Sequence, residues 1–107
     1  MTKSAGTASN KLNLPWDLFV DQSYTVYVAD RFNSRVQKFL FGSSNGSTVA
    51  GRTDGIAGKS AVTFNNTSGV TLDSYGNLYV ADMFNHRVQF FLKNNSTGVT
   101  IVGNGIE

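Results

Sequence analysis

Hydrophobic and polar positions along this chain form short runs that recur in a fixed order. Two kinds of run stand out: stretches rich in β-branched and aromatic residues, and stretches that alternate polar with apolar residues, both typical of β-strands. The predicted strands cover residues 17–21, 26–29, 35–39, 48–50, 69–73, 78–81, 87–91 and 100–102. No stretch has a convincing apolar period of 3.6 residues, so the pattern predicts an all-β protein.

The second half of the chain repeats the first at an offset of 52 residues. Residues 28–39 return without a gap as residues 80–91, and 16 of the 36 pairs from 16/68 to 51/103 are identical. The chain therefore holds two copies of a unit of four short antiparallel strands. Because both faces of each sheet carry apolar residues, the unit is typical of a β-propeller blade, which packs between two neighbours. A β-sandwich is the alternative, but its strands need not recur in the same order.

The repeat predicts how the chain is divided. We expect a flexible leader over residues 1–13, a first blade over 14–52, an inter-blade connector over 53–67 and a second blade over 68–107. Propellers close with about four to eight blades. Two blades would therefore leave two apolar faces open. Either the chain is a fragment of a longer propeller or several copies assemble, three copies making six blades.

Composition excludes several classes of protein. Nine Lys and Arg residues face seven Asp and Glu residues, and two of the basic residues, Lys3 and Lys11, lie in the predicted leader. The remainder is neutral overall, so binding to nucleic acid through charge is not expected. Without cysteine the chain has no disulfide, thiolate metal site or cysteine nucleophile. Apolar runs are too short to span a membrane, and the N-terminus lacks the apolar stretch of a signal peptide.

The two hairpins between the second and third strands resemble the core of the NHL repeat. Residues 27–39 and 78–89 carry the resemblance, and the Asn-His-Leu tripeptide of the family corresponds to Asn33-Ser34-Arg35 and Asn85-His86-Arg87. Residues 48–73 also resemble the segment that joins one NHL repeat to the next. The resemblance implies a propeller, usually of six blades, and does not by itself fix a function, because NHL propellers bind proteins or RNA, act as sensors or act as metal-dependent lyases.

Residues that are identical in the two hairpins are expected to be structural. Asp30 with Arg35, and Asp82 with Arg87, are placed to pair or to bond the hairpin backbone, with no more than about 1 kcal/mol from such a pair if it is exposed. Asn33 and Asn85 are expected at a turn position with positive φ. Asp21 and Asp73 each end a predicted strand near the channel of a propeller, where we interpret them as turn caps rather than cation ligands.

The hairpins also carry the residues that differ between the copies, beside a repeated phenylalanine. Aromatic residues, Met and Arg are enriched where proteins bind one another. The predicted partner-binding residues are therefore Arg31, Phe32, Met83, Phe84 and His86. In the alternative arrangement, Phe32 and Phe84 tuck against the neighbouring blade. His86 is the only histidine, and a lone histidine in a hairpin is more typical of a turn residue than of a metal ligand.

These features predict a non-catalytic module that binds a protein or peptide, with no cofactor and no metal. No nucleophile elbow, phosphate-binding loop or metal-ligand set is visible. Two alternatives follow from the resemblance: a piece of an enzymatic propeller similar to the peptidyl-hydroxyglycine lyase, or of a scaffold associated with ubiquitin ligases. Five N-glycosylation sequons lie in predicted connections, which leaves an extracellular and a cytoplasmic location equally open: Asn45, Asn65, Asn66, Asn94 and Asn95.

Overall fold

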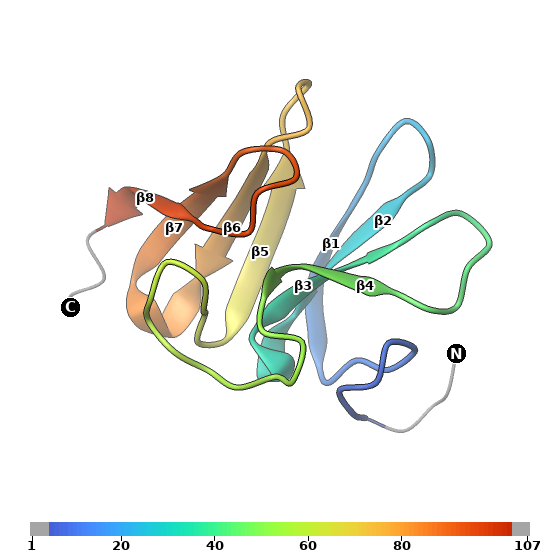
Figure 1. The fold of residues 1–107 in the computed structure, drawn as a ribbon, viewed down its shortest axis with the longest axis horizontal. Helices are drawn as coiled ribbons and strands as arrows, with labels where there is room; N and C mark the ends of the chain where they lie inside the picture. The colour runs from blue at the N-terminus through green and yellow to red at the C-terminus, as the bar shows by residue number, and fades with distance from the viewer. Residues whose placement is uncertain (1–4, 104–107) are drawn as a thin grey trace.

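The computed structural model describes residues 5–103 and contains two four-stranded antiparallel sheets (Figure 1). In each sheet the strands follow one another in chain order. The first sheet consists of β1 (Pro15–Val20), β2 (Val26–Asp30), β3 (Arg35–Phe39) and β4 (Ser47–Gly51), and the second of β5 (Thr67–Leu72), β6 (Leu78–Asp82), β7 (Arg87–Phe91) and β8 (Val99–Gly103). The prediction of an all-β protein with two such sheets is confirmed.

A short 3-10 turn joins the second and third strands of each sheet: η1 (Arg31–Asn33) and η2 (Met83–Asn85). The residue after each turn adopts the left-handed conformation, with φ of 49° at Ser34 and 53° at His86. The expectation that Asn33 and Asn85 hold positive φ was wrong. The 3-10 turn takes up one more residue before the chain reverses into the next strand, so the left-handed position moves one residue along.

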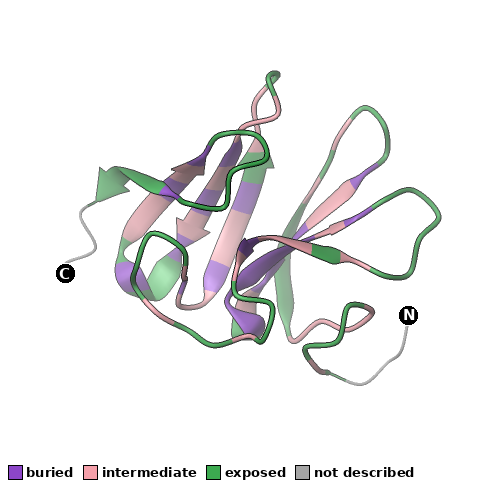
Figure 2. Cartoon of the chain, viewed as in Figure 1, coloured by how far each residue is buried: buried purple, intermediate pink, exposed green. Residues whose placement is uncertain are grey.

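The core lies between the two sheets, as the buried positions in Figure 2 show. One continuous apolar cluster joins residues of both sheets with Phe64 of the connecting segment, whose ring centroid lies 5.6 Å from that of Phe91. Its buried members are Ala29, Val36 and Ala50 from the first sheet, Phe64, and Val70, Leu78, Val80 and Phe91 from the second. Each sheet has a forward face, which carries Val36 in the first sheet and its counterpart Val88 in the second, and a rear face on the opposite side. The core lies between the forward face of the first sheet and the rear face of the second.

The repeated hairpin residues Val36/Val88 and Phe39/Phe91 divide between this cluster and other places. Val36 and Phe91 belong to the cluster. Phe39 is buried outside it, and Val88 is only half-buried. The difference arises because residues 36 and 88 both lie on forward faces, and only the first sheet has a neighbour on that side. Position in the pair of sheets therefore decides that Val36 is buried and Val88 is not.

Residues 6–13 fold onto the first sheet as residues 58–65 fold onto the second. The amide of Gly6 donates to the carbonyl of Leu12 at 3.3 Å, and the amide of Gly58, 52 residues later, donates to Phe64 at 2.8 Å. In the described part of the predicted leader the chain is thus a portion of the repeated unit and not a free tail. Residues 1–4 of that leader and 104–107 of the predicted second blade lie outside the described residues.

Candidate functional site

A buried ion pair underlies each 3-10 turn. Arg35 Nε donates to Asp30 Oδ2 at 2.8 Å, with the two side chains 1% and 0% exposed. Asp30 also accepts from Asn33 Nδ2 at 2.9 Å and from the amide of Asn13 at 2.7 Å. The rest of the Arg35 guanidinium donates to the carbonyls of residues 7, 11 and 53 at 2.8–3.1 Å. The predicted pairing of Asp30 with Arg35 is confirmed, but the pair is buried, so the limit given for an exposed pair does not apply.

The second sheet repeats this network. Arg87 Nε donates to Asp82 Oδ2 at 2.8 Å, and Asn85 Nδ2 donates to the same oxygen at 2.8 Å. The guanidinium of Arg87 also donates to two carbonyls of the connector, those of Ser60 at 2.8 Å and Thr63 at 3.0 Å. In both sheets the arginine of the ion pair therefore hydrogen-bonds the segment that precedes the first strand. We call each 3-10 turn, together with the buried ion pair beneath it, a platform.

The predicted partner-binding residues lie on these two platforms. Phe32 and Phe84 are 52% and 51% exposed, and Met83 is 39% exposed. His86 is also exposed and occupies the left-handed position that ends η2. Phe32 has a neighbouring sheet on its forward side and still exposes half its surface. The alternative in which this phenylalanine is tucked away is therefore not what the structure shows.

Arg31 differs from the other four residues because its side chain lies along the protein surface. Its guanidinium carbon lies 4.2 Å from the centroid of the Trp16 ring and 5.6 Å from that of Phe32. A guanidinium over an aromatic face is attracted by the ring quadrupole. Arg31 is half-buried as a result, and it links the platform of the first sheet to the start of β1.

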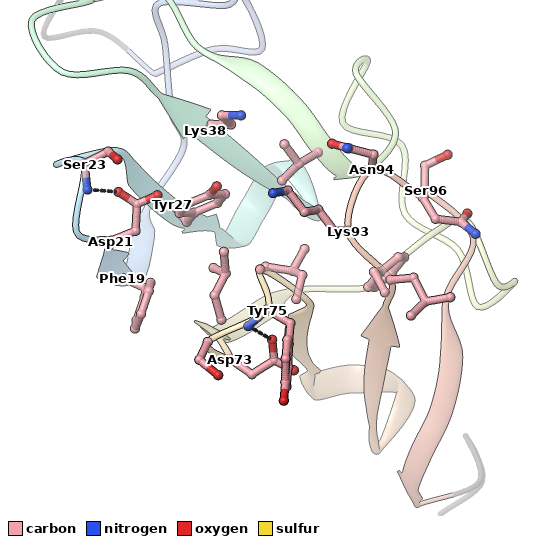
Figure 3. Close-up of a pocket in the computed structure, with 18 of the residues that line it drawn as sticks. Phe19, Asp21, Ser23, Tyr27, Lys38, Asp73, Tyr75, Lys93, Asn94 and Ser96 are labelled. Carbon is pink, nitrogen blue, oxygen red and sulfur yellow. Dashed lines mark hydrogen bonds between the residues drawn. The ribbon is translucent and has the colours of Figure 1, made fainter.

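Sequence reasoning missed a cleft of about 800 Å³ between the sheets, at the end opposite to the 3-10 turns (Figure 3). Its apolar wall includes Phe19 and Tyr27, and Figure 3 shows Lys93 directed into the space between the sheets. Its volume is that of a small-molecule site. The cleft could not be read from the sequence because its walls come from two different sheets. The only available signal was the aromatic residues at positions 19, 27 and 75.

Asp21 and Asp73 lie at this cleft and serve as turn caps, as predicted. Asp21 Oδ1 accepts from the amides of Ser23 and Thr25 at 2.9 and 3.0 Å. Asp73 Oδ1 accepts in the same way from the amides two and four residues later. Burial alone would raise the pKa of Asp73, but its hydrogen bonds, first those from Asn77, outweigh burial and hold this pKa below the ordinary value. The lowered pKa favours the ionised form of Asp73, which accepts the hydrogen bonds of its turn.

The five sequons occupy different surroundings. Those at Asn45, Asn94 and Asn95 are exposed in the loops after β3 and β7, whereas Asn65 and Asn66 are half-buried before β5. The hydroxyl of Thr67, which completes the first of these two half-buried sequons, is buried and donates to the carbonyl of Arg35 at 3.1 Å. The loop sequons are therefore the accessible ones in the folded chain.

Between residues 5 and 103, no three His, Cys, Asp or Glu side chains gather where they could hold a metal ion. Over the same residues, no helix has the length and apolar character needed to cross a membrane. Comparison with protein-family models and with curated proteins found no match for this chain.

Proposed function

We propose that the chain forms two blades of an NHL-type β-propeller and acts as a non-catalytic module that binds a protein or peptide. The proposed site is the rim, by which we mean Arg31, Phe32, Met83, Phe84 and His86. Two sheets of identical strand order, repeated at a fixed offset and packed face to face, support the propeller. The exposed aromatic residues of the rim support the binding of a partner.

One observation carries the proposal: two half-exposed phenylalanines are each held on a buried, hydrogen-bonded platform. Large apolar side chains are usually covered in a folded protein, and those that dominate binding are aromatic or arginine residues on a rigid support. Asp30 and Asp82 are fully buried beneath Phe32 and Phe84. The turns therefore need little reordering when a partner binds, which lowers the entropic cost of binding.

The test begins with a peptide selected on the chain itself. A library of random 12-residue peptides displayed on phage is selected against residues 1–107, and the best peptide is titrated by fluorescence anisotropy. We expect Phe32→Ala and Phe84→Ala each to weaken binding by about 30-fold, which corresponds to a hot-spot loss of about 2 kcal/mol. Tyr75→Ala serves as the control, because Tyr75 is 80% exposed and lies at the opposite end, in the cleft.

The outcome distinguishes the rim from the cleft. Peptides whose affinity survives both phenylalanine substitutions but falls with Tyr75→Ala would place the binding site in the cleft and overturn the rim. Failure to select any peptide that binds saturably would count against a peptide-binding module altogether.

A further inference from the structure

The pair of sheets leaves two faces without a neighbouring sheet. One is the forward face of the second sheet, and the other is the rear face of the first sheet. By the offset of 52 residues, these faces are the counterparts of the two faces that meet in the core. β1 and β8, the edge strands that belong to these faces, are largely exposed (Figure 2).

On the forward faces, the same positions are buried in one sheet and open in the other. Val36 and Ala50 are 0% and 1% exposed in the core. Their counterparts in the second sheet, Val88 and Val102, are half-buried and 59% exposed. The open face is thus at least as apolar as the covered one, since a valine replaces the alanine. An exposed apolar patch of this kind marks an interaction surface.

The rear faces show the same contrast along their first strands, β1 and β5. Val70 is 6% exposed in the core, whereas its counterpart Leu18 is 59% exposed. Leu72 packs partly buried against the core, whereas its counterpart Val20 is 46% exposed. Along β1 the open rear face therefore exposes apolar side chains whose counterparts in β5 are covered, whereas Val28 and Phe39 on the same face are buried, at 7% and 6% exposed, without a neighbouring sheet.

Residue sizes on the two open faces are complementary where the first strands meet. Between the two sheets, the exposed Asp17 reaches across from β1, and its Oδ2 accepts from the amide of Val70 at 3.2 Å, close to Gly69, which follows the small Ser68. Glycine replaces this aspartate in the second sheet, and Trp16 of the first sheet stands at the position of Ser68. If the two open faces met, the space left by the missing side chain of Gly69 would lie beside the large side chain of Trp16. The large residue would then come from the rear face and the small one from the forward face, the reverse of the arrangement between the two sheets of one chain.

We propose that copies of this chain pack head to tail, with the forward face of the second sheet of one copy on the rear face of the first sheet of the next. The occupant of each open face is a second copy, because the exchange of large and small residues matches these two faces to each other. Such heterologous contacts form a ring if the rotation closes. Rings of four to eight blades need two, three or four copies. This inference rests on the propeller part of the proposed function and not on the rim.

The first measurement is the absolute mass of residues 1–107 by light scattering, with a chain mass of 11.6 kDa. We expect one discrete species of two, three or four chains. Leu18→Asp blocks the rear face of the first sheet, and Val102→Asp blocks the forward face of the second, so each variant alone should be a monomer. Both residues are 59% exposed, so neither charge enters the core of a single chain.

Mixing the two variants gives the decisive result. The Leu18→Asp copy keeps an intact forward face and the Val102→Asp copy keeps an intact rear face, so the mixture should form a 1:1 dimer that cannot grow. If instead two forward faces or two rear faces met, only the variant altered on that face would become a monomer, and the other variant would still assemble. Formation of the dimer also demonstrates that both variants are folded.

A matched pair of valines provides the control. Val20 lies on the open rear face and Val62 in the connector, and both are 46% exposed. We expect Val20→Asp to reduce the assembly to monomers and Val62→Asp to leave its mass unchanged. Three results would overturn the proposal: a wild-type chain that is a monomer, a mixture of blocked variants that stays monomeric, or equal effects of the two valine substitutions. A monomer that still binds the selected peptide would overturn the assembly alone, and an assembly that binds no peptide would overturn the rim alone.

Discussion

Replacing Arg35 by methionine tests whether the buried ion pair holds the first sheet and residues 6–13 together. Arg35 is fully buried and donates four hydrogen bonds, one to Asp30 and three to carbonyls of residues 7, 11 and 53. Methionine fills a similar volume without donors. The substitution would leave the Asp30 carboxylate buried beside no cation, a change that costs about 3–5 kcal/mol. That is a large share of the roughly 5–15 kcal/mol stability of a small domain.

Arg87 provides the matched comparison. Its side chain is 8% exposed, and it donates to Asp82 and to two carbonyls, so water can replace part of what is lost. We expect Arg87→Met to be less destabilising than Arg35→Met. The double variant Arg35→Met with Asp30→Asn should recover part of the loss, because it removes the unpaired charge.

The assay is urea unfolding followed by circular dichroism at one fixed protein concentration, with the free energy of unfolding compared at equal m-values. A fixed concentration is required because assembly would add to the apparent stability. Limited proteolysis provides a second readout, since residues 6–13 should become susceptible in Arg35→Met. A loss below about 1 kcal/mol, the range of exposed pairs, together with unchanged proteolysis would refute the reasoning.

Two further predictions concern a glycine and a carboxylate. Gly51 and Gly42 both hold positive φ, but an added Cβ would lie 2.6 Å from the Ser34 carbonyl oxygen at Gly51 and would meet nothing within 4 Å at Gly42. Gly42→Ala should therefore cost about 1 kcal/mol for the left-handed backbone, and Gly51→Ala clearly more, in the same urea assay; equal losses would contradict the close approach. The Arg52 guanidinium hydrogen-bonds Asp54 and lowers the pKa of that carboxyl from 3.8 to about 2. This contribution to stability is present above pH 3.8 and is lost as the pH falls toward 2. In Arg52→Gln, a carboxyl-carbon NMR titration should show the Asp54 pKa rising toward 3.8, and an unchanged pKa would show that Arg52 is not the cause.

Sequence reasoning located the strands well because strand formation here depends on local features. Alternation and β-branched content predicted all eight strands to within a few residues, and the offset of 52 predicted two equivalent sheets. It also paired Asp30 with Arg35, since the strand register places them directly opposite each other. The conformation of the turn between these two residues was harder to predict from the sequence. Whether Asn33 or Ser34 takes positive φ depends on one extra residue in the 3-10 turn, and both are turn-forming types.

Other features depend on residues that are far apart in the chain. The sequence pattern predicts a leader over residues 1–13 although Gly6 and Asn13 match Gly58 and Asn65 at the same offset, because two identities without a strand pattern are a weak signal. The burial of Arg35 depends on carbonyls 18 to 28 residues away. The cleft exists only between two sheets.

Local alternation and the repeat by themselves determined the strands, their order and the equivalence of the two units, because these three features follow directly from the order of residues along the chain. Only the tertiary structure decided that Val36 is buried and Val88 is not, since the two valines have the same local sequence pattern and differ in having a neighbouring sheet. Burial is a property of what lies across an interface, and the pattern along one strand does not contain it.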